Sequence, residues 1–294
     1  MSKFKEWRAG YLFALPALAY MLFFVGYPII DNIRLSLLDV NVMNLVNGDQ
    51  PFVGLDNYTK LFREGTLVKV LQNTLIFTVM CIALQFVVGL AFALLFQLSF
   101  RFSQRLRGLV MISWLLPATI TAMMFKFMFG SGGIINDVLL RLHLIQAPIE
   151  WLVEQHTAMF TVILANTWIG IPFNMILLTT ALTTIPKDIY ESAAIDGANV
   201  LQRFFRITLP QLKAAILSLL VLGFIYTFKV FDIVLIITNG GPVNSTQMMS
   251  TFAYKLSFDQ FQYSQGAAVA NVMFLVLLVV GFIYMRLLNR EERS

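Results

Sequence analysis

The sequence predicts an all-α membrane protein with six transmembrane helices. Of its 294 residues, 58% are hydrophobic and only 13% are charged, which is about half the charged fraction of a typical soluble domain. The mean hydropathy of +0.76 indicates more apolar surface than a water-soluble fold of this size can bury. A spanning helix needs about 20 apolar residues, so six spans use roughly 125 residues and leave room for structured loops.

Six stretches with few charges are the expected spans, and they lie at about 11–33, 72–99, 108–129, 158–180, 214–237 and 266–286. A basic N-terminal segment leads into the first stretch without a small-residue cleavage site behind it. We interpret this stretch as a retained span and not as a signal peptide. The second stretch is uncharged from Val70 through Phe100, and at this length it is expected to tilt in the bilayer or to extend beyond it.

The cations predict that both termini are cytoplasmic. With the N-terminus inside, thirteen Lys and Arg residues fall in the inner segments, counting Arg286 at the inner end of the last span, and six fall in the outer loops, counting Arg34. Positive residues are enriched in cytoplasmic loops, so this asymmetry favours that orientation. It also accounts for the net charge of +5 without any nucleic-acid partner.

Two outer loops carry recognisable local signals. Asp56 is expected to cap a short surface helix whose apolar residues include Leu61 and Phe62. Gly130-Ser-Gly-Gly133 and Asn239-Gly-Gly-Pro242 have the composition of turns that end a span.

The sequence lacks the residues of the common catalytic and cofactor sites. The single cysteine, Cys81, excludes an intramolecular disulfide, and the two histidines, His143 and His156, do not form a zinc-binding motif. No phosphate-binding loop of the Gly-x-x-x-x-Gly-Lys-Ser/Thr type occurs. We therefore predict no catalytic residue, no metal and no cofactor, and any energy that the protein uses must come from a partner or from an ion gradient.

The inner loop at 181–213 is too long for a plain connection and predicts two short helices. Thr184 is expected to cap the first, Pro186 to lie near its first position, and Gly197 to end it. A second helix is expected at about 199–207. On pattern alone, an amphipathic connector lying in the membrane interface explains this loop too.

Residues in this loop resemble a known motif. Tyr190-Glu-Ser-Ala-Ala-Ile-Asp-Gly-Ala198, followed by Phe204 and Ile207-Thr-Leu-Pro210, is similar to the EAA motif of permease subunits in binding-protein-dependent ABC importers. Ser192 stands where the motif has alanine, a small-for-small difference. Further stretches resemble the carbohydrate branch of the maltose and glycerol-3-phosphate type. They are Asn166-Thr-Trp-Ile-Gly-Ile-Pro-Phe173, Phe231-Asp-Ile, Thr238-Asn-Gly-Gly-Pro242 and Gly54-Leu-Asp-Asn-Tyr58.

The resemblance implies a single permease domain over 1–294 with the type I ABC importer fold, in the cytoplasmic membrane of a bacterium or archaeon. It implies that the helix at 187–197 is a coupling helix that docks an ATPase. The coupling residues would be Glu191, Ser192, Ala193, Asp196 and Gly197. The implied partners are a second permease subunit, an ATPase dimer, an extracytoplasmic sugar-binding protein, membrane lipid and the sugar itself.

Polar residues within the apolar stretches are candidates for the substrate pathway, because they are costly in a membrane. These candidates are Asn166, Trp168, Asn174, Tyr226 and Asn271. Gly170 and Pro172 are expected to open the helix backbone beside them. The alternative is that such amides, together with Gln85 and Gln97, only join helices to one another.

An ion-coupled secondary transporter is the rival function. Such a transporter normally places a carboxylate near the middle of the membrane. The only candidate is Asp232, near the outer end of its stretch, and Lys229 is expected on the same helical face to neutralise it.

Overall fold

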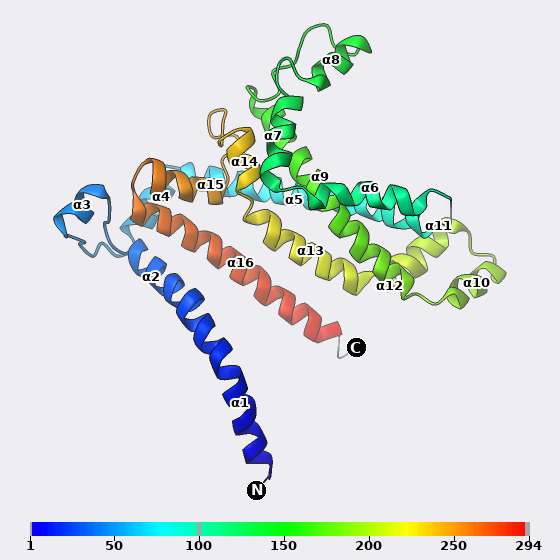
Figure 1. Cartoon of the computed structure of the whole chain (residues 1–294), viewed down its shortest axis with the longest axis horizontal. Coiled ribbons are helices and arrows are strands. Elements are labelled where there is room, and N and C mark those ends of the chain that lie inside the picture. The colour runs from blue at the N-terminus through cyan, green and yellow to red at the C-terminus, as the bar shows by residue number, and fades with distance from the viewer. Residues whose placement is uncertain (1, 99–100, 292–294) are drawn as a thin grey trace. The chain divides into compact units, whose positions relative to one another are not determined.

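A computed structural model describes residues 2–98 and 101–291, which are mostly helical (Figure 1). Within these residues the β pairing is limited to one isolated bridge between Leu38 and Phe52. The chain forms two compact units. The first runs through Leu67 and includes Phe252–Leu275, and the second consists of Val68–Thr251 and the chain after Leu275. Each unit is described by itself.

The helices follow one another along the chain, and the longest connections are 142–154 and 238–248. In chain order they are α1 (Ser2–Met21), the π-helix η1 (Leu22–Gly26), α2 (Tyr27–Ser36), α3 (Val42–Asn47), α4 (Asp56–Arg63), α5 (Thr66–Gln97), α6 (Ser103–Leu115), α7 (Ala118–Met128), α8 (Ile134–Arg141), α9 (Gln155–Thr183), α10 (Lys187–Ile195), α11 (Val200–Arg203), the π-helix η2 (Phe204–Thr208), α12 (Leu209–Gln211), α13 (Lys213–Phe228), α14 (Asp232–Ile237), α15 (Met249–Tyr254), the π-helix η3 (Lys255–Asp259) and α16 (Tyr263–Glu291).

Four continuous helices are long and apolar enough to cross a membrane. They are Phe13–Ser36, Thr66–Gln97, Gln155–Thr183 and Tyr263–Leu287. Two further pairs, α6 with α7 and Val200–Gln211 with α13, qualify only if each bent pair counts as one span. The described residues therefore hold between four and six candidate spans.

The stretch at 108–129 is bent rather than straight. α6 and α7 meet at an angle of 98°, as Figure 1 shows. The cause is Pro117, which disfavours helical backbone at the residue before it. Leu116 accordingly is extended, with ψ of 136°.

The stretch at 214–237 is interrupted as well. α13 ends at Phe228, and α14 begins only at Asp232, after Phe231 leaves the helical conformation. Lys229 and Asp232 therefore do not share a helical face, and the expected pairing between them is wrong. The ammonium of Lys229 instead lies 5.3 Å from the centroid of the Tyr226 ring.

A saturated polar cluster joins α2, α4 and α16 in the first unit. The Asn271 side-chain amide donates to the hydroxyl groups of Ser36 (2.9 Å) and Tyr58 (3.1 Å). Its carbonyl accepts from the side chain of Asn32 at 2.6 Å. Every polar group of Asn271 thus has a partner, and the cluster holds the three helices together.

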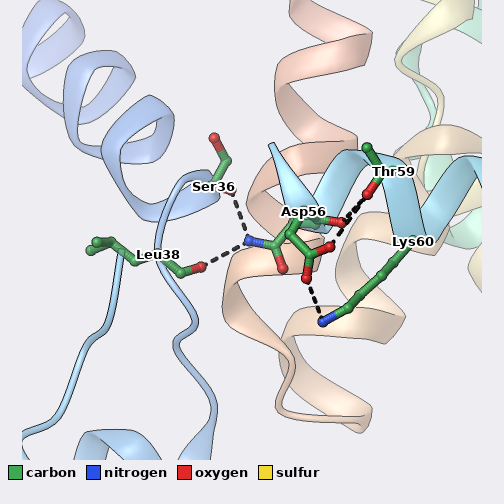
Figure 2. A network of polar contacts seen from close by, with 6 residues as sticks. Ser36, Leu38, Asp56, Thr59 and Lys60 are labelled. Atoms are coloured by element: carbon green, nitrogen blue, oxygen red, sulfur yellow. Dashed lines mark hydrogen bonds and ion pairs between the residues drawn. The ribbon is translucent and has the colours of Figure 1, made fainter. Parts of the chain in front are cut away.

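Asp56 begins α4 but does not cap it. The residue at the N-cap position is Leu55, which offers no side-chain hydrogen bond, so the expected cap is wrong. Asp56 lies in the first helical turn and pairs with Lys60 at 2.7 Å, as Figure 2 shows. The adjacent Asn57 amide is buried and donates to the Ser36 and Leu38 carbonyls, which fixes the end of α2 against α4.

The core of the second unit lies among α5, α7, α9 and α14. Its buried side chains are mostly aromatic or aliphatic. They include Phe77, Cys81, Ala122, Phe125, Phe129, Val162, Ile163, Ala165, Ile233, Val234, Ile237 and Met248. A smaller cluster, made by Ala93, Leu178, Leu182, Ile185, Leu212 and Leu219, packs the bases of α5, α9 and α13.

Candidate functional site

A cavity of about 400 Å³ opens among α5, α6, α9 and α13 in the second unit. Its volume lies within the range of small-molecule sites, about 300–1,000 Å³. Amides and aromatic rings dominate its wall. The lining residues are Gln85, Trp114, Asn166, Ile169, Gly170, Phe173, Asn174, Gly223, Tyr226 and Thr227.

Two glycines bring α5 and α9 close together at this cavity. A Cβ atom on Gly89 would lie 2.5 Å from the Cβ of Asn174, and one on Gly170 would lie 2.2 Å from the side chain of Gln85. Small residues allow such close approach of membrane helices. Because the two helices are close here, the Gln85 side chain donates a hydrogen bond to the Asn166 carbonyl at 3.1 Å.

Asn174 is 3% exposed, and only one of the two polar groups of its side chain has a hydrogen-bond partner. Its side-chain amide donates to the Gly170 carbonyl at 2.9 Å, but its Oδ1 has no hydrogen-bond partner in the described part of the chain. Buried polar atoms are almost always paired, so an orphan acceptor in a cavity wall needs an explanation. Because Oδ1 itself is buried, a ligand hydroxyl group would supply the missing donor only after the Asn174 side chain turned toward the cavity.

Three aromatic rings line the same cavity. Trp114 from α6 lies 6.4 Å from Phe173, centroid to centroid, at an interplanar angle of 52°. Tyr226 from α13 is 63% exposed, so its ring and hydroxyl group are accessible. Rings beside amides can bind a polyhydroxylated ligand through its apolar faces and its hydroxyl groups.

The structure brings together three of the five residues predicted for the pathway: Asn166, Asn174 and Tyr226 line the cavity. Trp168 is 44% exposed and does not line it. Asn271 belongs to the polar cluster of the first unit. α9 also continues through Pro172 to Thr183, so the expected opening of its backbone is wrong.

Sequence reasoning missed Trp114, Phe173 and Thr227. Trp114 lies three residues before Pro117, in a stretch that we expected to be one straight span. The proline was the available signal, because a bend displaces the residues before it from a simple helical register. Gln85 was expected to join helices, and it does so, but it also lines the cavity.

The loop at 181–213 forms helices close to those expected. α10 runs from Lys187 to Ile195 after Pro186, and Gly197 follows with φ of +79°, a conformation that favours glycine. α11 begins with a capping box in which Asn199 and Gln202 bond each other's backbone. Thr184 does not cap α10, because it ends α9 and its hydroxyl group donates to the Ala181 carbonyl.

The predicted coupling residues lie on an accessible surface. Glu191, Ser192, Asp196 and Gly197 are exposed, whereas Ala193 is partly buried. Neither carboxylate forms an ion pair within the described residues. Ile195, 87% exposed, and Leu201 add apolar area to the same loop.

Tyr190 attaches the loop at 181–213 to neighbouring helices. Its hydroxyl group shares a hydrogen bond of 2.9 Å with Thr208 in η2. Its ring packs against the cluster at the bases of α9 and α13. α10 is therefore attached to the helices that carry the cavity wall.

The described residues contain no group of three or more His, Cys, Asp or Glu side chains that could hold a metal ion.

Comparison with known proteins decides the family. Residues 85–294 match the family described as the binding-protein-dependent transport system inner membrane component. The chain belongs to this family. This permease is 33% identical over 286 residues to the trehalose/maltose transport system permease protein MalF of Thermococcus litoralis, covering 97% of this chain and 95% of that protein.

One further relative and one solved structure agree with this assignment and with the fold, respectively. The lactose transport system permease protein LacF of Rhizobium radiobacter is 34% identical over 278 residues, covering 93% of the permease and 92% of LacF. The fold matches a chain in the crystal structure of a bacterial alginate ABC transporter in complex with an alginate pentasaccharide-bound periplasmic protein. That match has a TM-score of 0.82 at 21% identity and covers 99% of this chain and 98% of the other. The permease thus has the type I ABC permease fold.

Proposed function

We propose that this chain is one of two membrane subunits of an ATP-driven importer whose cargo is a disaccharide or short oligosaccharide. The observation that carries the proposal is the 400 Å³ cavity in which Asn174 has an orphan acceptor. Amides and aromatic rings surround it. Relatives named for trehalose, maltose and lactose transport support a sugar as the cargo.

The buried polar side chains argue for this function over ion-coupled transport. Among the described residues they are hydroxyl groups and amides, and none is a carboxylate. Ion-coupled transporters use intramembrane carboxylates to bind protons or sodium. Hydroxyl groups and amides suit a neutral, hydrogen-bonding cargo better.

The topology that we propose has six spans in a single permease domain over 1–294, in the cytoplasmic membrane, with both termini in the cytoplasm. The four continuous helices, the bent pair of α6 and α7, and the apolar helix α13 support six spans. The excess of cations in the inner segments supports the orientation. The loop at 181–213 then faces the cytoplasm.

Energy coupling is proposed to occur at this loop. Glu191 and Asp196 offer unpaired charges, and exposed apolar residues offer the contact area that a docked partner would cover. An ATPase pair is the proposed partner. A second permease subunit would complete the passage, and an extracytoplasmic binding protein would deliver the sugar.

The cavity is tested by Asn166→Ala and Asn174→Ala in the purified complex. We expect Asn174→Ala to lower uptake and substrate-stimulated ATPase activity by about fivefold to tenfold, as for one lost hydrogen bond of about 1–1.5 kcal/mol. Gln97→Ala is the matched control, because Gln97 lies exposed at the end of α5. Full uptake in both variants would show that these amides only pack helices.

The coupling loop is tested by Glu191→Lys. Charge reversal turns an attraction at an interface into a repulsion, so ATPase should be lost from the purified complex while membrane insertion is unchanged. Lys187→Glu, on the same helix, is the control for a change of charge. ATPase yield and transport at wild-type levels in Glu191→Lys would exclude the proposed role.

A further inference from the structure

A second cavity, of about 730 Å³, lies in the first unit. It is formed by the segment around α3, by α4, and by the connection from η3 into α16. Its wall is rich in side-chain amides. They belong to Asn41, Asn44, Asn57, Gln260, Gln262 and Gln265.

One wall of this cavity is held rigidly. The buried Ser264 hydroxyl oxygen accepts a hydrogen bond from the Val40 N–H at 2.8 Å, which ties the start of α16 to the segment before α3. Asn57 is fixed by the Ser36 and Leu38 carbonyls. Lys60 is held by Asp56, as Figure 2 shows.

The segment at 260–265, which contains Ser264, also carries side-chain amides that are not used by the protein. Gln260, Gln262 and Gln265 form no side-chain hydrogen bond with any described residue, although all three line the cavity. An amide group both donates and accepts hydrogen bonds. Three such groups around one space can serve several hydroxyl groups at once.

Phe261 lies between two of these glutamines in an unfavourable backbone conformation. Its φ is +55°, which is rare for a bulky residue and costs of order 1 kcal/mol or more. The conformation ends η3, where the Gln260 and Gln262 N–H groups bond back to Lys255 and Leu256. It also leaves the Phe261 ring 49% exposed at the cavity. Glycine would fit this backbone without strain, so a phenylalanine here points to a use for the ring.

We infer that this cavity is a second binding site for a sugar, separate from the cavity that contains Asn174. An aromatic ring beside unpaired amides matches the apolar face and the hydroxyl groups of a sugar ring. Two charged side chains line the cavity. The Lys60 ammonium is neutralised by Asp56, and the Asp39 carboxylate can accept hydrogen bonds from hydroxyl groups of a neutral ligand. The volume, within the range of about 300–1,000 Å³, accommodates a small ligand such as a disaccharide.

The inference depends on the proposed function in two respects. A sugar as the ligand and a position on the outer side of the membrane both follow from that function. In the proposed topology, the loops that form this cavity lie on the outer side. The site would therefore hold sugar before it enters the membrane passage.

The experiment uses Phe261→Trp, which keeps an aromatic ring at the cavity and adds a fluorescent reporter. The complex is reconstituted in nanodiscs of phospholipid only, without glycolipid or sugar detergent, because either could occupy the site. Maltose, trehalose, lactose and diacetylchitobiose are titrated without ATP or binding protein. We expect at least one sugar to change the tryptophan emission beyond the change in the wild-type complex. Adding Gln262→Leu and Gln265→Leu should weaken that response about tenfold.

Each outcome decides the inference. No response to any of the four sugars, or an equal response in the variant with both leucines, overturns it. A response to sugar-free binding protein but not to sugar assigns the cavity to protein docking and overturns it as well. The proposed function fails separately, if the wild-type complex does not take up any sugar in an ATP-dependent assay.

Discussion

Two groups of amides lie within the apolar helices, and they differ in how completely they are satisfied. In the first unit, Asn271 finds partners for its amide and its carbonyl among Asn32, Ser36 and Tyr58. In the second unit, Asn174 bonds only the Gly170 carbonyl and keeps an orphan acceptor. The first group lies among packed helices, and the second lies beside a cavity.

The difference shows that the role of an asparagine in an apolar stretch cannot be inferred from the sequence alone. Such residues are expensive in a membrane, whether they bind cargo or join helices. An unpaired amide is not enough to indicate a ligand site, because the Gln247 Oε1 atom is also unpaired and lines neither cavity. Asn174 differs from Asn271 both in its unpaired acceptor and in its place in a cavity wall.

The largest expected effect is that of Gly170→Val, which disrupts the close packing of α9 on α5 next to Asn174. The new side chain would overlap Gln85, since even a Cβ atom comes within 2.2 Å of it. Overpacking of this kind costs about 1–3 kcal/mol. We expect more than a tenfold loss of uptake and a lower yield of complex.

Gly281→Val is the control for Gly170→Val, because no atom lies within 4 Å of the position that its Cβ would take. Gln85→Ala added to Gly170→Val should restore yield by making room. A normal yield and uptake in Gly170→Val alone would contradict the described packing of α5 on α9.

A smaller effect is expected for Asn271→Ala, and it should be of a different kind. Hydrogen bonds between membrane helices contribute about 0.6 kcal/mol each and at most about 1.7 kcal/mol. The thermal unfolding midpoint of the complex should therefore fall by a few degrees, while uptake per assembled complex is unchanged. Asn174→Ala should show the reverse pattern. Equal loss of stability in both variants would remove the distinction between the two groups.

The smallest effect is expected at the surface pair of the first unit. The hydrogen bond from Lys60 holds the pKa of Asp56 below its ordinary value. A lowered pKa adds stability above the pKa of the unfolded chain, about 3.9, and that stability is lost as the pH falls through the folded value. Both groups are exposed, so the contribution is small.

Asp56→Asn should accordingly lower the unfolding midpoint slightly at pH 7, and the difference from the wild type should shrink as the pH falls below about 3.9, the pKa of the unfolded chain. Asp137→Asn, which removes the similar exposed pair with Arg141, is the matched comparison. A difference that grows in acid would contradict the direction of the pKa shift.

Helix content and the position of the inner loop could be predicted from the sequence, because both depend on local patterns. Long uncharged stretches predicted α5, α9 and α16, and Pro186 with Gly197 predicted the limits of α10. These signals act over a few residues, so tertiary structure does not override them.

The cavity could be predicted only in part, because its wall depends on helix rotation. Asn166 and Asn174 were found through their polarity. Trp114 could not be distinguished from other aromatic residues until the bend at Pro117 was known. Asn271 could not be excluded, because its three partners come from helices more than 200 residues away in the sequence.

The bend between α6 and α7 has a consequence for what can surround this chain in a bilayer. Pro117 has no N–H, so the Ser113 carbonyl loses the donor that a continuous helix would provide. The N–H groups of Ala118 and Thr119 precede the first hydrogen bonds of α7, which run from Ile120 and Thr121 to the Pro117 carbonyl. Acyl chains cannot hydrogen-bond such groups, so each of them needs a partner in protein or water. Ser113 is buried against the rest of the described chain, so protein and not acyl chain adjoins the bend on that side.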